Sequence, residues 1–104
     1  YTRFDNLREK YILSPQAQRN LKDIRAYTLK SFGKQQTRAY LKILQTHMKA
    51  LAATPSKGKK RDEIKTDYYS SFIGSHTIYY RIAHTHIDIF DALHQSMEPM
   101  RHFT

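Results

Sequence analysis

The fold is decided by the stretch SHTIYYRIA, residues 75–83. Its β-branched and aromatic residues are typical of a strand that is buried on at least one face. The run YSSFI precedes it at residues 69–73, and IDIFDAL follows at residues 87–93 with alternating apolar and polar positions. Gly74 suits a tight turn that needs positive φ, and residues 84–86 form a short polar loop. The stretch therefore predicts three consecutive antiparallel strands with one apolar face to cover.

Two amphipathic helices are expected to supply this cover. Ser14 and Pro15 are typical of a helix start, since serine caps the first turn and proline suits the first helical position, and Gln18 stands near the capping-box position. The first helix is expected at residues 15–32, Gly33 ends it, and the second follows at residues 34–53. The apolar positions expected to face the sheet are Ala17, Leu21, Ile24, Thr28 and Leu29, then Tyr40, Leu41, Ile43, Leu44, His47, Met48 and Leu51. One glycine between the helices predicts an antiparallel helical hairpin.

The ends of the chain complete the expected architecture. Residues 10–13 can join the sheet as a first strand, at an edge or beside a later strand, after a polar arm at residues 1–9. The tail after Leu93 has room for one short turn of helix. We expect a single α+β domain over residues 10–104. An N-terminal strand comes first, an antiparallel helical hairpin packs on a small antiparallel sheet, and a short C-terminal turn of helix follows.

The composition narrows the kinds of partner. The 104 residues contain 18 Lys plus Arg against 9 Asp plus Glu, a net charge of +9 that favours nucleic acid or an acidic protein. Without cysteine, neither disulfides nor thiolate metal sites can form. No apolar run approaches the roughly 20 residues of a membrane span, and no signal peptide is visible, so we expect a soluble, cytoplasmic protein that does not engage membranes.

Catalytic motifs are not found. A Gly-rich phosphate loop and a GxSxG elbow are both missing. Asp88 and Asp91 are expected to be solvated surface charges. His84 and His86 are too few for a zinc site, which usually has three or four ligands. We therefore predict no catalytic residue, no metal and no cofactor.

Basic residues are the candidates for binding. Lys57, Lys59, Lys60 and Arg61 form a cationic loop that either contacts phosphate groups or is simply solvated. Arg81 lies in the predicted middle strand, where a buried guanidinium needs a partner. It is either a binding residue or the partner of Asp88 or Asp91 on the next strand.

The order of these motifs resembles the ParE toxins of bacterial type II toxin–antitoxin modules, within the ParE/RelE superfamily. The resemblance covers about residues 10–103. It is carried by LSPQA at residues 13–17, Leu21, Ile24, Tyr27, Pro55, GSHTIYYR at residues 74–81, LHQSM at residues 93–97 and Arg101-His102.

This resemblance implies the ParE/RelE fold and growth inhibition by poisoning of DNA gyrase, through binding and without turnover by this chain. It also implies a cognate acidic antitoxin that forms a hetero-oligomer with the toxin and links it only indirectly to operator DNA. The expected binding residues are the basic loop, Arg81 and the tail residues His94, Met97, Met100, Arg101, His102 and Phe103. The alternative is a RelE-like ribosome-dependent mRNA endoribonuclease, but Thr77 stands where those nucleases carry an arginine that would stabilise the transition state.

Overall fold

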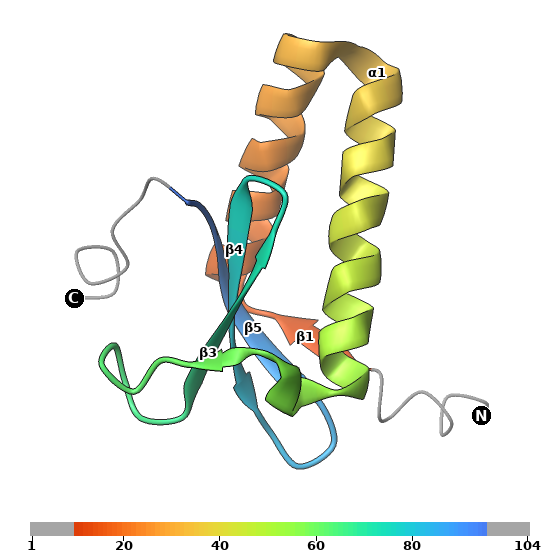
Figure 1. Ribbon diagram of the computed structural model, residues 1–104. Coiled ribbons are helices and arrows are strands. Elements are labelled where there is room, and N and C mark those ends of the chain that lie inside the picture. The colour runs from red at the N-terminus through yellow and green to blue at the C-terminus, as the bar shows by residue number, and fades with distance from the viewer. Residues whose placement is uncertain (1–9, 96–104) are drawn as a thin grey trace.

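The computed structural model describes residues 10–95, and three strands form the centre of the sheet (Figure 1). They are β3 (Tyr68–Ile73), β4 (His76–Ile82) and β5 (Ile87–His94). Both β3 and β5 pair with β4 in antiparallel fashion, which confirms the prediction from the sequence. Gly74 has a φ of +58° in the turn between β3 and β4. The arm at residues 1–9 and the predicted turn of helix beyond Gln95 lie outside the described residues.

Two short strands lie at the edges, and the order is β1-β5-β4-β3-β2. The strand β1 (Tyr11–Leu13) lies at an edge beside the later strand β5, as expected, and runs parallel to it, so the sheet as a whole is mixed although the predicted meander is antiparallel. The contact between β1 and β5 continues one residue beyond β1, where the Ser14 N–H donates to the carbonyl of Ile89 at 2.9 Å. The strand β2 (Lys59–Lys60) pairs with β3 and was not predicted, since two lysines carry no apolar pattern.

Both predicted helices lie in α1 (Pro15–Ala53), which is interrupted at Gly33. Ser14 Oγ accepts a hydrogen bond from the N–H of Ala17 at 3.0 Å, as expected of a cap, whereas the Gln18 amide donates to the carbonyl of Leu13. Gly33 has φ 86° and ψ 176°, and the ribbon turns back there (Figure 1). We call residues 15–32 the first arm and residues 34–53 the second arm. Within the described chain, no helix is long and apolar enough to cross a membrane.

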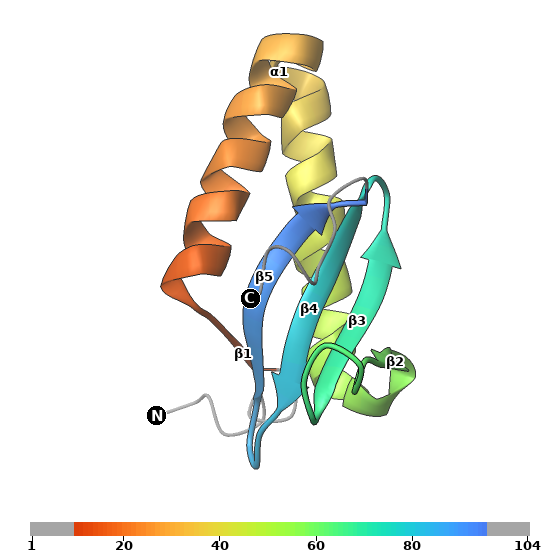
Figure 2. The same ribbon diagram turned by 90° about the vertical axis from the view of Figure 1, so that its left-hand side faces the viewer.

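The hairpin covers one face of the sheet (Figure 2). The buried core joins Ala17, Ile24, Leu44, Met48 and Leu51 of α1 to Ile78, Tyr80, Ile87 and Ile89 of the sheet. Two predicted core positions were wrong, because Leu29 is 38% exposed and Ile43 is 49% exposed. Each is next in sequence to a buried residue and is therefore rotated from it by about 100° around the helix.

Tyr80 ties the sheet to the end of α1. Its side chain is fully buried, and its hydroxyl donates to the carbonyl of Pro55 at 2.6 Å and accepts from the N–H of Gly58 at 3.1 Å. A Cβ at position 58 would lie 2.1 Å from the Tyr80 hydroxyl. Only glycine therefore fits where the loop after α1 crosses the sheet.

A register shift between Tyr79 and Tyr80 changes which residues of β5 are buried. Tyr79 pairs with Asp91 and Tyr80 with Ile89, so Phe90 is the extra residue of a β-bulge. Asp91 is completely buried, and its Oδ1 accepts hydrogen bonds from the Asn20 amide and the N–H of Ala92. The prediction that Asp91 is a solvated charge was wrong because the alternation of the strand does not continue through the bulge.

We predict that Gly33→Ala destabilises the protein by about 1 to 3 kcal/mol, measured as the free energy of unfolding in urea. The cost comes from the backbone, because no atom lies within 4 Å of a Cβ built at this glycine. The control is Ser31→Ala, an exposed helical position that should change the free energy by less than about 0.5 kcal/mol. Equal stability of the Gly33→Ala variant and the wild type would show that the reversal does not need glycine.

Candidate functional site

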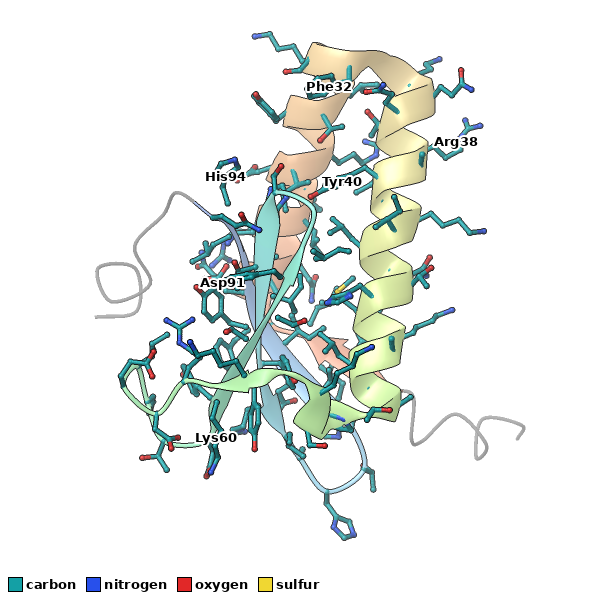
Figure 3. All side chains as sticks on the ribbon, viewed as in Figure 1. Phe32, Arg38, Tyr40, Lys60, Asp91 and His94 are labelled. Atoms are coloured by element: carbon teal, nitrogen blue, oxygen red, sulfur yellow. The ribbon has the colours of Figure 1, made fainter. Side chains whose placement is uncertain are left out.

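The predicted basic loop lies at the end of the molecule opposite to the tip of the hairpin, as the positions of Lys60 and Phe32 show (Figure 3). Lys57, Lys59 and Lys60 are exposed. Arg61 is different, because its side chain is only 18% exposed and is engaged by Glu63 and by Ser70 Oγ at 3.2 Å. The loop therefore offers three exposed lysines and one arginine that is held in place.

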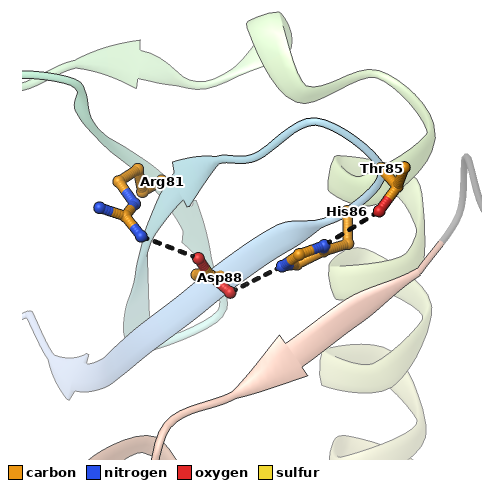
Figure 4. A network of polar contacts seen from close by, with 4 residues as sticks. All are labelled: Arg81, Thr85, His86 and Asp88. Carbon is orange, nitrogen blue, oxygen red and sulfur yellow. Dashed lines mark hydrogen bonds and ion pairs between the residues drawn. The ribbon is translucent and has the colours of Figure 1, made fainter.

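Arg81 has the ion-pair partner that was one of its two predicted alternatives. Its Nη2 donates to Asp88 Oδ2 at 3.1 Å, while Asp88 Oδ1 lies 2.9 Å from His86 Nε2 (Figure 4). Thr85 Oγ1 extends this network at 3.3 Å from His86 Nδ1. The Arg81 side chain is 57% exposed, so this pair contributes little to stability, on the order of 1 kcal/mol or less.

Of the binding residues predicted in the tail, the structure describes only His94, and this residue lines a groove. A hollow of about 320 Å³ between the two arms and the start of β4 is lined by Tyr27, Thr28, Phe32, Gln36, Tyr40, Ser75, His76 and His94. A second hollow of about 340 Å³ continues along β5 and is lined by Asn20, Asp23, Ile24, Tyr27, His76, Ala92, Leu93 and His94. We call the two together the aromatic groove, because Tyr27, His76 and His94 line both.

Large aromatic side chains stand open to solvent at this groove. Tyr27 is 66% exposed and Phe32 is 59% exposed, and both come from the end of the first arm near the reversal. Exposed aromatic side chains beside a hollow are typical of protein-binding surfaces, where burying such side chains supplies much of the affinity. Asp23 is the only acidic residue in the lining.

The hydroxyl of Tyr40 fixes the floor of the groove. It lies 2.6 Å from His76 Nδ1 and accepts the N–H of Ser75 at 3.2 Å. A Cβ on Gly74 would come within 2.7 Å of the Tyr40 ring, so the turn between β3 and β4 packs closely against the second arm. The ring of His76 in turn meets that of His94 edge-on, with centroids 5.6 Å apart.

Sequence reasoning missed four of the groove residues, namely Tyr27, Phe32, Tyr40 and His76, as binding residues. Tyr27 and Phe32 do carry a signal, because both are large aromatics outside the predicted buried stripe of the first helix. No such signal marks Tyr40 and His76, since they are 36 residues apart and meet only in the folded chain.

The predicted residues do not form one site. Arg81 lies two strands across the sheet from the basic loop, since Lys60 pairs with Tyr69 and Tyr68 pairs with Arg81, whereas His94 pairs with His76 at the opposite end of β4. The remaining predicted residues, Met97, Met100, Arg101, His102 and Phe103, lie outside the described residues. Between Lys10 and Gln95, no three histidine or acidic side chains come together as possible metal ligands.

Comparison with known proteins indicates the family of the chain. The family described as the ParE toxin of type II toxin-antitoxin system, parDE, matches residues 11–99. Toxin ParE1 of Mycobacterium tuberculosis is 39% identical over 90 residues, which cover 86% of this chain and 92% of that protein. Toxin ParE1 of Caulobacter vibrioides is 32% identical over 92 residues, covering 88% and 95%. A structure described as a chromosomal ParDE TA system from P. aeruginosa shares the fold, with a TM-score of 0.71, 12% identity and coverage of 85% and 97%.

We predict that acid destabilises the protein through His76. Burial, and then the charge of His94, lowers the pKa of His76 below its usual 6.5. The unfolded chain therefore binds more protons than the folded one below that value, and the free energy of unfolding falls as the pH drops from about 7.5 to about 5.5. The fall in urea midpoint should be smaller in His76→Gln. Part of the fall should remain in both proteins because of His47, whose pKa is also lowered by burial and by the charge of Lys57. Equal falls would contradict this role.

Proposed function

The chain belongs to the ParE toxins of type II toxin–antitoxin systems, and on this premise we propose that it arrests growth by binding DNA gyrase and that a cognate antitoxin neutralises it. The proposed antitoxin site is the aromatic groove. The observation that carries this assignment is the exposure of Tyr27 and Phe32 beside the two adjoining hollows.

The groove suits a segment that becomes ordered on binding. Its two hollows together follow the first arm from Asn20 to Phe32, so a partner would bury a line of side chains and not a single anchor. An acidic antitoxin segment would also meet a chain of net charge +9, which accelerates encounter and makes it salt-sensitive. The resulting hetero-oligomer would contact operator DNA through the antitoxin.

We propose that the chain acts by binding and not as an enzyme. Arg61 and Arg81, two of the predicted binding arginines, are each engaged by a carboxylate on their own sheet or loop. The position of Thr77, where a RelE-like nuclease would carry an arginine, is buried at 3% exposure in β4. Nothing observed favours the ribonuclease alternative. Because gyrase is the proposed target, we also propose that the protein acts in the cytoplasm.

The gyrase contact is assigned to the three exposed lysines of the basic loop. Lys57, Lys59 and Lys60 are solvent-accessible, and Lys60 lies far from the hairpin tip (Figure 3). Cations in such a place gain by approaching phosphate or acidic groups of a gyrase–DNA complex. Target and antitoxin would then engage different ends of the toxin.

We predict that Tyr27→Ala and Phe32→Ala each weaken antitoxin binding about tenfold or more, because each removes an aromatic anchor. Isothermal titration calorimetry of the purified proteins measures this. Phe72→Ala is the matched control, since Phe72 is 69% exposed but does not line the groove. A loss as large for Phe72→Ala as for the groove variants would refute the groove assignment.

In a supercoiling assay with relaxed plasmid, the toxin is expected to inhibit gyrase and to accumulate linear DNA, and the antitoxin to restore supercoiling. Reversing two charges with Lys59→Glu and Lys60→Glu should raise about tenfold the toxin concentration that is required to inhibit supercoiling. The control, Lys22→Glu with Arg25→Glu, makes the same change in net charge on the exposed side of the first arm. Undisturbed supercoiling at excess toxin, with mRNA cleaved on ribosomes, would overturn the gyrase proposal.

A further inference from the structure

A row of cations lies along the outer side of the second arm. We call Lys34, Arg38, Lys42 and Lys49 the cationic ridge, and all four are exposed. At about 100° per residue they fall within an arc of about 80° along about 22 Å of helix. The centre of this arc lies roughly 100° around the helix from the centre of the buried residues of the arm. Arg38 accordingly projects from the side of the second arm that faces away from the sheet (Figure 3).

No negative charge of the second arm balances this ridge. The arm has no acidic residue, so it supplies four of the nine net positive charges of the chain. Among the described residues, no carboxylate forms an ion pair with any of the four cations, whereas Arg61 and Arg81 are each paired. The first arm differs, because Asp23 stands among its cations and Arg19 donates to the side chain of Gln16 at 3.0 Å. The ridge therefore keeps its positive charge available to a partner.

The spacing within the ridge opposes helix formation. Lys34 with Arg38, and Arg38 with Lys42, are like-charged pairs four residues apart, which destabilise a helix instead of supporting it. A local feature that works against folding is expected where a sequence also has to serve a function. A polyanion bound along the ridge would remove this repulsion.

The surroundings of the ridge favour a polyanion over a protein or a membrane. Gln45 and Ala52 are the other residues of the same arc, and the exposed apolar side chain of Ile43 lies about 140° away around the helix. Protein interfaces are centred on aromatic and apolar anchors and are depleted in lysine. A membrane surface is likewise bound through apolar side chains that enter it. Charge, and not apolar burial, must therefore supply the affinity of this surface.

A double-stranded nucleic acid fits these properties. Each strand of duplex DNA carries one phosphate per about 3.4 Å of its axis, so the length of the ridge corresponds to about six successive phosphates of one strand. Single strands are usually held by aromatic side chains that stack on the bases, and the ridge contains none. Contacts to phosphates alone carry no sequence information.

We propose that the cationic ridge binds the phosphate backbone of duplex DNA without reading its sequence. The choice of DNA over RNA rests on the proposed function, because gyrase, the proposed target, acts on duplex DNA. This contact belongs to the toxin itself and is distinct from the indirect contact with operator DNA through the antitoxin. The ridge begins next to Gly33 and ends eight residues before Lys57, so it leads from the hairpin tip towards the basic loop.

The test measures binding of the purified full-length toxin, alone, to a fluorescent DNA duplex of about 30 base pairs by anisotropy, between about 50 and about 200 mM salt. Arg38→Gln with Lys42→Gln removes two phosphate contacts. The plot of log affinity against log salt should therefore become shallower by about 1.8, and the affinity at low salt should fall about tenfold or more. Two duplexes of unrelated sequence should bind equally well.

The matched control is Lys10→Gln with Lys65→Gln. It removes the same charge from two exposed lysines outside the second arm, and it should change the salt slope by less than about 0.5. Equal changes of slope in the control and in the ridge variant would show an effect of net charge alone and would overturn the inference.

Three other results would also overturn it. The first is no binding of the wild-type toxin to the duplex at low salt, and the second is an unchanged salt slope in the ridge variant. The third is tighter binding to a DNA single strand, to an RNA duplex of the same length or to phosphatidylserine vesicles. The assay contains no gyrase, so its failure leaves gyrase inhibition untouched. A toxin that binds the duplex but does not inhibit gyrase would refute the proposed function alone.

Discussion

The hydroxyl of Tyr40 makes the contact on which the proposed antitoxin site depends. It joins the second arm to His76 at the start of β4 and to the backbone of Ser75 in the preceding turn. The hairpin of helices must cover the sheet because Ile78 and Tyr80 present an apolar face, but hydrophobic burial alone is non-directional. The polar contact sets where the tip of β4 meets the second arm, and the aromatic groove opens between that point and the first arm.

The same architecture separates the two surfaces assigned to partners. Gly33 reverses the helix at one end, where Tyr27 and Phe32 stand open, and the buried Tyr80 hydroxyl holds the lysine-bearing loop near the other end. A toxin of this size has one core, so distance along its long helices is the means of keeping two binding surfaces apart. An antitoxin bound in the aromatic groove would then act without covering the basic loop.

Much of the fold could be predicted because its signals are local. The residues around Tyr79 indicate a strand from their own composition, and Gly33 marks the reversal between two periodic helices. The direction of β1 and the bulge at Phe90 depend on contacts distant in sequence, and no local pattern encodes them. The groove was harder still, since it joins both arms to β4 and β5. Charge pointed to Arg61 and Arg81. Asp88 was already one of the expected partners of Arg81, whereas the pairing of Arg61 with Glu63 became evident only in the structure.

The most direct test is an NMR titration of the isotope-labelled toxin, a 12.4 kDa chain, with unlabelled antitoxin. Because the groove is proposed as the antitoxin site, the largest changes in amide chemical shift should fall at Tyr27, Phe32, His76 and His94, with the amides of residues 57–63 changing little. If the largest changes instead fall at residues 57–63 and 81–88 while those four amides stay unchanged, the antitoxin binds elsewhere and the account of the groove is wrong.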